Sequence, residues 1–265
     1  MSLPTIIGFV LSLILFLASI VESTTNFKIF LHATGFVMVI CGTLAASFTA
    51  FEARYVIGAL KMIKGIFVQP RIDRAMLTNE VARVIRWAYM MQKNGIQAVE
   101  GDVKSLKSQD AFLAYGMSLV VSGYTGEEVR RLLENQVETS FHRRTVPTEI
   151  LKYMASNAPA FGMMATLVGL VIMLDNMGSD PSQLGPGMAV GLLGTLYGVL
   201  FARLVIMPAA SKAHQREAIV RFRNMLVSEG MALLAERKSP RFIQDAMNSY
   251  LDPAIHFDID RAPKK

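Results

Sequence analysis

Four stretches of the chain are apolar over the length of a membrane-spanning helix, which takes about 20 residues. They cover residues 4–21, 29–51, 156–174 and 187–208, and the nearest carboxylates stand only at their ends. The chain of 265 residues is 52% hydrophobic and only 18% charged, less charge than a soluble protein of this length usually carries. The pattern predicts an all-α integral membrane protein with four transmembrane helices, of which the first is a retained helix rather than a signal peptide.

The remaining residues form a long polar insert between the second and third spans and a tail after the fourth. In the insert, apolar residues recur at helical spacing over 81–89, and Thr125 and Glu128 have the spacing of a capping box that opens another helix. Ser239-Pro240 has the pattern of a helix start within the tail. We therefore expect four segments: transmembrane helices 1 and 2 (1–51), a helical domain (52–155), transmembrane helices 3 and 4 (156–208) and a helical tail (209–265).

The lysines and arginines lie on one side of this arrangement. The connection between the first two spans holds only Lys28, and the connection between the last two holds no basic residue, whereas the insert and the tail are rich in both types. Because positive charge stays inside, both termini, the insert and the tail are expected in the cytoplasm, with the basic residues beside the lipid headgroups. No basic patch interleaved with aromatic residues accompanies the net charge of +6, so nucleic-acid binding is not expected.

Small residues recur three or four positions apart in the last two spans, so that they line one face of each helix. Such faces let helix backbones approach closely within a bilayer. The helix-packing candidates are Gly162 and Gly169 in the third span and Gly187, Gly191 and Gly198 in the fourth.

The chain has no constellation for catalysis. It lacks a phosphate-binding loop, paired cysteines and histidines at a metal-binding spacing, so we expect neither an enzyme, a cofactor nor a bound metal. A cation that crosses the membrane needs a compensating carboxylate, and here a partner would have to supply it. Pro159 and Pro208 stand at the cytoplasmic ends of the last two spans, where each either ends its helix or serves as a hinge.

The last two spans resemble the MotA/PomA family of flagellar stator subunits, which is related to ExbB and TolQ. The resemblance rests on three stretches, which read NAPAFGMMATLVGLV from Asn157, GPGMAVGLLGTLYG from Gly185 and MPAASK from Met207. It implies a homo-pentamer around two helices of a MotB/PomB-type partner, whose single span supplies the membrane aspartate. It also implies that Pro159 and Pro208 are the coupling prolines and that the insert acts on the rotor protein FliG. An ExbB/TolQ-type motor that energises an outer-membrane system is the alternative.

The resemblance implies two further sets of residues. Rotor contact would fall to Lys93 and Glu100, with Gln92 at the place where the family usually has arginine, although surface charges of this kind are also often merely solvated. The ion pathway would involve Thr166 and Thr195, with Gly194 at the place of a second threonine in sodium-type relatives. The two threonines favour sodium over protons, whereas the ordinary alternative is a hydroxyl bonded to its own helix four residues back.

Overall fold

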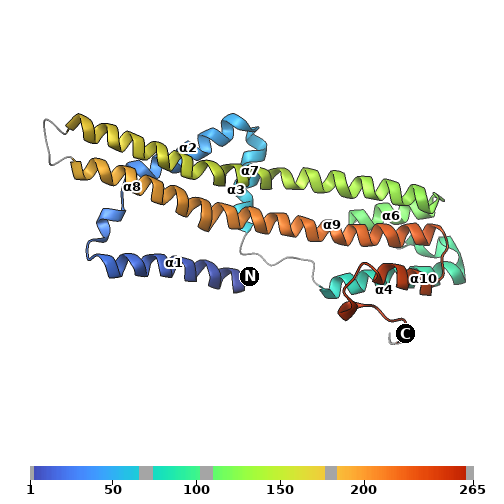
Figure 1. Cartoon of the computed structure of the whole chain (residues 1–265). Helices are drawn as coiled ribbons and strands as arrows, with labels where there is room; N and C mark the ends of the chain where they lie inside the picture. Colours follow the sequence, from blue (N-terminus) through green and yellow to red (C-terminus); the bar gives the residue numbers. More distant parts are fainter. Residues whose placement is uncertain (1–2, 66–73, 102–109, 177–183, 261–265) are drawn as a thin grey trace. The chain divides into compact units, whose positions relative to one another are not determined.

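The computed structural model describes residues 3–65, 74–101, 110–176 and 184–260, and every regular element among them is helical (Figure 1). The chain divides into two compact units. Unit 1 comprises residues 1–69 and 144–215, and unit 2 comprises residues 70–143 and 216–265. These boundaries differ from the four expected segments, because residues 52–65 and 144–155 belong to the unit that contains the apolar spans.

Unit 1 contains the apolar helices. They are α1 (Leu3–Ser23), η1 (Phe27–Phe30), α2 (Ala33–Ala50), α3 (Ala53–Lys64), part of α7 (Gly126–Asn176), α8 (Leu184–Leu200), the π-helix η5 (Phe201–Ile206) and the start of α9 (Met207–Ala235). Four helices of the described chain are long and apolar enough to cross a membrane. The prediction of four spans is therefore confirmed.

The third span is not a separate helix. A single helix, α7, runs from Gly126 to Asn176 and includes both the second half of the expected insert and the third span. The capping box at its start forms as predicted: the Glu128 carboxylate accepts from Thr125 N–H at 2.9 Å, and Thr125 Oγ1 accepts from Glu128 N–H at 3.3 Å. No helix boundary falls at residue 155, where the helical domain was expected to meet the third span, because helical residues connect the two without interruption.

Small side chains let the helices of unit 1 pack closely. Its buried core includes Ala59, Ala158, Ala202, Ala209 and Ala210, together with larger residues of α3 and α7. On α8, the Tyr197 hydroxyl donates to the Phe30 carbonyl and accepts from His32 N–H, which ties this helix to the connection between α1 and α2. Most of the large apolar side chains of α1 are exposed, as expected for a helix that faces lipid or another subunit.

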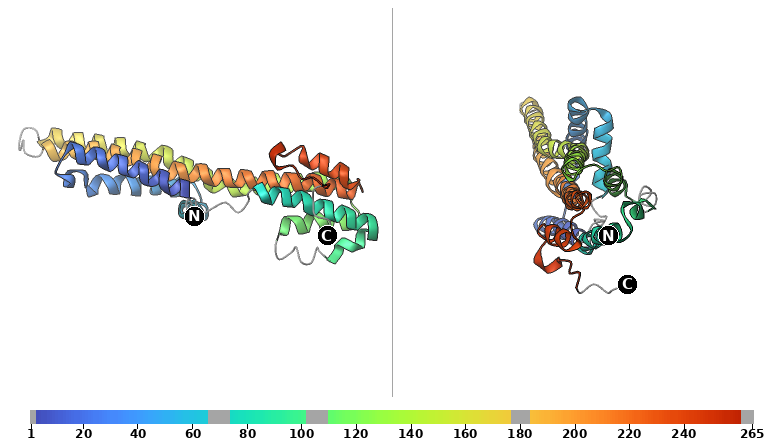
Figure 2. Two further views of the ribbon diagram at one scale, coloured as in Figure 1. Left: turned by 90° about the horizontal axis from the view of Figure 1, so that it is seen from below. Right: turned by 90° about the vertical axis from the view of Figure 1, so that its right-hand side faces the viewer.

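Unit 2 is a helical domain with an aliphatic and aromatic core. It contains α4 (Arg74–Asn94), η3 (Ile96–Val99), α6 (Ala111–Val121), α10 (Pro240–Asn248) and η6 (Pro253–Ile255), with the start of α7 and the rest of α9. Figure 2 shows α4 and α10 side by side, in agreement with their contacts. In the tail, α9 ends at Ala235, and α10 begins at the Ser239-Pro240 pattern, where the Ser239 hydroxyl caps the helix by accepting from Phe242 N–H.

Candidate functional site

The glycine faces of α7 and α8 meet, as their spacing predicts. A Cβ atom on Gly169 would lie 2.6 Å from the Gly187 carbonyl oxygen, and one on Gly162 would lie 2.8 Å from the Gly194 carbonyl oxygen. A Cβ atom on Gly191 would lie 3.0 Å from the Cα of Thr166. Real Cβ atoms do not approach backbone this closely, so the two helices can take up this separation only with glycine at these positions.

The same close approach brings two hydroxyl groups together. Thr166 Oγ1 of α7 lies 2.7 Å from Thr195 Oγ1 of α8. Thr166 Oγ1 also lies 3.0 Å from the Gly191 carbonyl oxygen and 3.2 Å from the Gly162 carbonyl oxygen, which Thr195 Oγ1 approaches at 3.3 Å. Thr166 thus contacts the carbonyl four residues back in its own helix, as the ordinary alternative expects, and both hydroxyls contact oxygens of the facing helix.

This cluster has more acceptors than protons. Two hydroxyl groups bring two protons, whereas four oxygen–oxygen contacts join the two hydroxyls and the two carbonyls. Two protons cannot serve all four contacts at once, so the hydroxyl protons are shared between alternative acceptors. Such a group of hydroxyl and carbonyl oxygens is suited to a hard monovalent cation.

A small cavity adjoins the cluster. Its volume is about 60 Å³, and its lining comes from Thr166, Leu170, Gly187, Met188, Gly191 and Leu192. Leu170, Met188 and Leu192 contribute apolar side chains, so the polar side chain in this lining is that of Thr166. Among the described residues, no three histidine, cysteine, aspartate or glutamate side chains come close enough to hold a metal ion.

Gly194, the third expected ion-pathway residue, directly precedes Thr195 on α8 and lies at a close helix contact. A Cβ atom on Gly194 would lie 2.4 Å from the Cβ of Ala165, and one on Gly35 of α2 would lie 3.4 Å from the Cα of Gly194. Gly194 therefore lies where α8 packs against α7 and α2. A threonine there would have no room for its side chain.

Pro159 lies inside α7, which continues for four more turns to Asn176. The possibility that this proline ends its helix is therefore wrong. Pro159 has no N–H for the carbonyl four residues earlier, so it weakens the helix at this point. It also lies at the helix contact, because a Cβ atom on Gly198 would come within 3.1 Å of the Pro159 Cα and 2.5 Å of the Ala158 carbonyl oxygen.

Pro208 also lies within a helical path rather than at its end. It is the second residue of α9, directly after the π-helix η5, and the Met207 N–H donates to the Ala202 carbonyl five residues back. Proline cannot donate to Leu204, and its ring crowds that carbonyl, so the turn before it widens. The sequence left open whether Pro208 ends its helix or serves as a hinge. In the structure the helix does not end at Pro208, and a π-helix precedes it.

The three expected rotor-contact residues lie in unit 2 at the end of α4 and just beyond it. Gln92, Lys93 and Glu100 are all exposed. Gly95 separates them with a φ of 77°, a left-handed value that favours glycine, and the short helix η3 follows. The turn thus brings the three residues to one end of the unit, where a partner can reach them.

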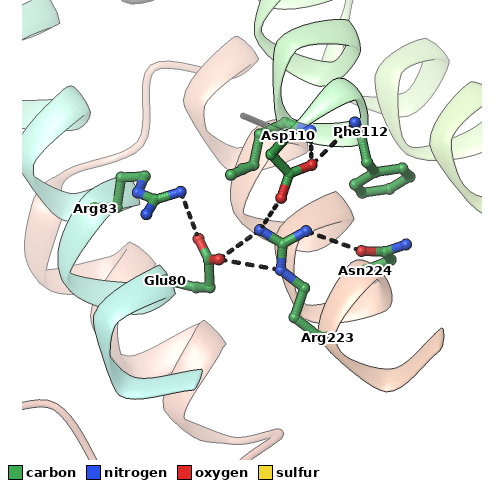
Figure 3. A network of polar contacts seen from close by, with 7 residues as sticks. Glu80, Arg83, Asp110, Phe112, Arg223 and Asn224 are labelled. Carbon is green, nitrogen blue, oxygen red and sulfur yellow. Dashed lines mark hydrogen bonds and ion pairs between the residues drawn. The ribbon is translucent and has the colours of Figure 1, made fainter. Parts of the chain in front are cut away.

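A buried ion network in unit 2 was not foreseen from the sequence. The Arg223 side chain, 5% exposed, contacts the Glu80 carboxylate at 2.5 Å and the Asp110 carboxylate at 2.6 Å (Figure 3). Arg83 also pairs with Glu80 at 3.2 Å, and Asp110 caps α6 by accepting from Phe112 N–H. Only the Asp110 cap could have been recognised beforehand, because the network joins three helices that are far apart in sequence.

Known proteins resemble this chain over nearly its whole length. The model of the MotA/TolQ/ExbB proton channel family matches residues 104–223. Chemotaxis protein PomA of Vibrio alginolyticus is 30% identical over 84% of this chain and 85% of its own, and motility protein A of Cereibacter sphaeroides is 31% identical over the same shares. The uncharacterized protein YtxD of Bacillus subtilis (strain 168) is 30% identical over 92% of this chain and 88% of its own.

Solved structures share the fold. A chain of C. jejuni MotAB superposes with a TM-score of 0.85 at 21% identity and covers both chains completely. A chain of the flagellar MotAB stator complex from Bacillus subtilis gives 0.83 at 21% identity and covers 95% of this chain and 97% of its own. The all-helical fold with four apolar spans is thus that of these stator proteins. Taken with the sequence matches, this makes the chain a member of the MotA/TolQ/ExbB proton channel family, a family of channel proteins rather than enzymes.

Proposed function

We propose that this protein is the ion-conducting stator subunit of a bacterial flagellar motor, and that it couples sodium flow to torque on the rotor. The observation that carries the proposal is the oxygen cluster around Thr166 and Thr195, which lies between two spans that contain no carboxylate. The cluster offers an ion a polar contact inside an apolar helix pair, yet it has no group that can take up and release a charge.

The missing acid comes from a partner. A charge in the low-dielectric core is costly unless an opposite charge compensates it, and the four apolar spans have none to offer. We propose that a MotB/PomB-type subunit with a single span supplies an aspartate, and that five copies of this chain surround two such spans in the inner membrane. The lysines and arginines of the insert and tail favour a cytoplasmic position for both termini.

Sodium is the ion that the cluster suits better. A proton needs only a titratable group and a path of water, whereas sodium needs several oxygen ligands. Two hydroxyls and two carbonyls, joined by four contacts of 2.7–3.3 Å, support such ligation once a carboxylate from the partner completes it. Gly194 is the third residue of the proposed pathway: it precedes Thr195 and has no side chain, so α7 and α8 can approach closely there.

Torque leaves the protein through unit 2. We propose that Lys93, Glu100 and Gln92 contact FliG and that Pro159 and Pro208 couple ion movement to motion of α7 and α9. Each proline interrupts the hydrogen bonding of a helix that runs through both units, which supports this role. One charge that falls through 100 mV yields about 2.3 kcal/mol, so several ions contribute to each working cycle.

The motility proteins among the relatives and the pair of helices before the insert favour this proposal over an ExbB/TolQ-type motor. A reconstitution experiment tests it. The chain is placed in liposomes alone and together with its MotB-type partner, and sodium and proton uptake are measured under an imposed potential. We expect sodium uptake only with the partner. Selective cation leak through the chain alone contradicts the shared pathway, and uptake of protons in place of sodium contradicts the choice of ion.

A further inference from the structure

A pocket opens in unit 2 where the ends of α4 and α9 lie side by side. Its volume is about 220 Å³. The pocket is lined by Ala88, Met91, Gln92, Gly95, Ile96, Leu234, Arg237 and Lys238. Four of these side chains are apolar and form its floor, whereas Gln92, Arg237 and Lys238 are exposed and stand at its mouth. The pocket therefore has an apolar interior and a polar, basic rim.

Arg237 is held in an unusual backbone conformation beside this pocket. The end of α9 is a Schellman motif, in which Arg237 N–H donates to the Leu234 carbonyl at 3.0 Å and Lys238 N–H donates to the Leu233 carbonyl at 3.1 Å. This geometry gives Arg237 a φ of 55°, and no other residue besides glycine has a positive φ in the described part of the chain. Glycine is the usual residue at this position of the motif, because it has no Cβ to crowd the backbone.

The arginine brings a charge that the fold itself does not use. Lys238 pairs with Glu236 at 3.5 Å and lies over the Phe242 ring, whereas the Arg237 guanidinium forms no ion pair with any described residue. A strained position that keeps a long, unpaired cation points to a function for the side chain rather than for the fold.

We infer that this pocket docks an acidic and apolar segment of the rotor protein, with Arg237 as the residue that pairs with its carboxylate. The volume fits one or two side chains, since pockets for drug-sized ligands start at about 300 Å³. The rim is continuous with the proposed rotor contact, because Gln92 lines the pocket and Lys93 follows it on α4. An apolar side chain fills the floor while its neighbouring carboxylate meets Arg237.

This inference rests on the proposed function, and substitutions at Arg237 separate the two. Arg237→Gly removes the cation and gives the backbone the residue that the Schellman motif prefers, so the melting temperature stays at or above that of the parent. Arg237→Glu reverses the charge. Arg241→Gln is the matched control, because it removes one positive charge in the same unit from an arginine that pairs with Asp260 at 2.8 Å, outside the pocket.

The experiment uses the full chain with its MotB-type partner in nanodiscs and measures the binding of purified FliG from the same species. We expect a Kd about threefold weaker for Arg237→Gly. For Arg237→Glu we expect a Kd about tenfold weaker, and parental binding for Arg241→Gln. If both Arg237 variants bind FliG as tightly as the parent, the pocket is not the docking site, and the rotor proposal remains intact. The same result is expected if the pocket binds a small molecule. No FliG binding by the parent overturns the rotor proposal together with this one.

Discussion

The hydroxyl oxygens of Thr166 and Thr195 lie 2.7 Å apart, although 29 positions separate them in the chain. The contact exists because glycines on both helices allow α7 and α8 to approach closely enough for the two short side chains to meet. The packing of the helices and the chemistry of the proposed ion pathway thus depend on the same face.

Removal of the Thr166 hydroxyl should slow ion flow. Thr166→Val keeps the shape of the side chain but removes the hydroxyl that contacts the Gly191 carbonyl and the Thr195 hydroxyl, and loss of such a hydrogen bond costs about 0.5–1.5 kcal/mol. We expect sodium uptake by the reconstituted complex to fall about tenfold. Thr166→Ser restores the hydroxyl and most of the uptake. Thr139→Val, which alters an exposed threonine bonded to its own helix, serves as the control.

The helix contact should not tolerate a methyl group. In Gly169→Ala the new Cβ would lie 2.6 Å from the Gly187 carbonyl oxygen, so α7 and α8 must separate, at a cost of about 1–3 kcal/mol. The melting temperature of the purified protein should fall. Gly8→Ala is the comparison, because a Cβ there meets nothing within 4 Å and alanine favours a helix. An equal melting temperature for the two variants would show that the close approach does not contribute to stability.

Pro208 should matter for coupling rather than for assembly. In Pro208→Ala the backbone gains an N–H for the Leu204 carbonyl, which favours a regular α-helix over the π-helix before it. We expect normal assembly with the partner but a large loss of swimming speed in a motility assay. Pro147→Ala is the matched control, since this proline also lies inside a helix of unit 1 but outside the contact of α7 with α8. Full motility of the Pro208 variant would exclude the coupling role.

The buried arginine of unit 2 should be essential to its stability. Arg223→Met leaves Glu80 buried without its main partner, and such a broken buried pair costs about 3–5 kcal/mol. Arg221 lies in α9, as Arg223 does, and forms a half-exposed pair with Glu138 of α7. Arg221→Met breaks this pair, which should cost about 0–1 kcal/mol. Denaturant melts of the two variants give the comparison. A similar loss of unfolding free energy in both variants would mean that the buried network stabilises the protein no more than the half-exposed pair does.

The capping box at the start of α7 should make stability depend on pH. The hydrogen bond from Thr125 N–H, together with that from its hydroxyl, holds the pKa of Glu128 below its ordinary value. A lowered pKa in the folded state adds stability above the unfolded pKa, and this is lost as the pH falls through the folded pKa. The difference in melting temperature between the parent and Glu128→Gln should therefore shrink from about pH 5 to about pH 3. Glu127→Gln is the control, because it removes the neighbouring charge and leaves the capping box intact. The difference in melting temperature between this variant and the parent should not show the same trend.

Much of the architecture is determined by local sequence. The length of the apolar stretches specifies four spans, since a helix needs about 20 apolar residues to cross the bilayer. The caps at Thr125 and Ser239 specify where two helices begin, because each cap satisfies N–H groups within its own first turn. The glycine spacing also predicts which faces of α7 and α8 meet.

Only the tertiary structure decided the features that combine distant residues. The continuous course of α7 past residue 155 and the π-helix before Pro208 are seen only in the structure, because a proline can be accommodated in several ways. The contact of Gly194 with Gly35 of α2 also joins positions that are distant in the sequence. Arg223 and Arg237 look like ordinary surface arginines in the sequence. Their surroundings come from helices more than 100 positions away, and such contacts leave no periodic pattern near either residue.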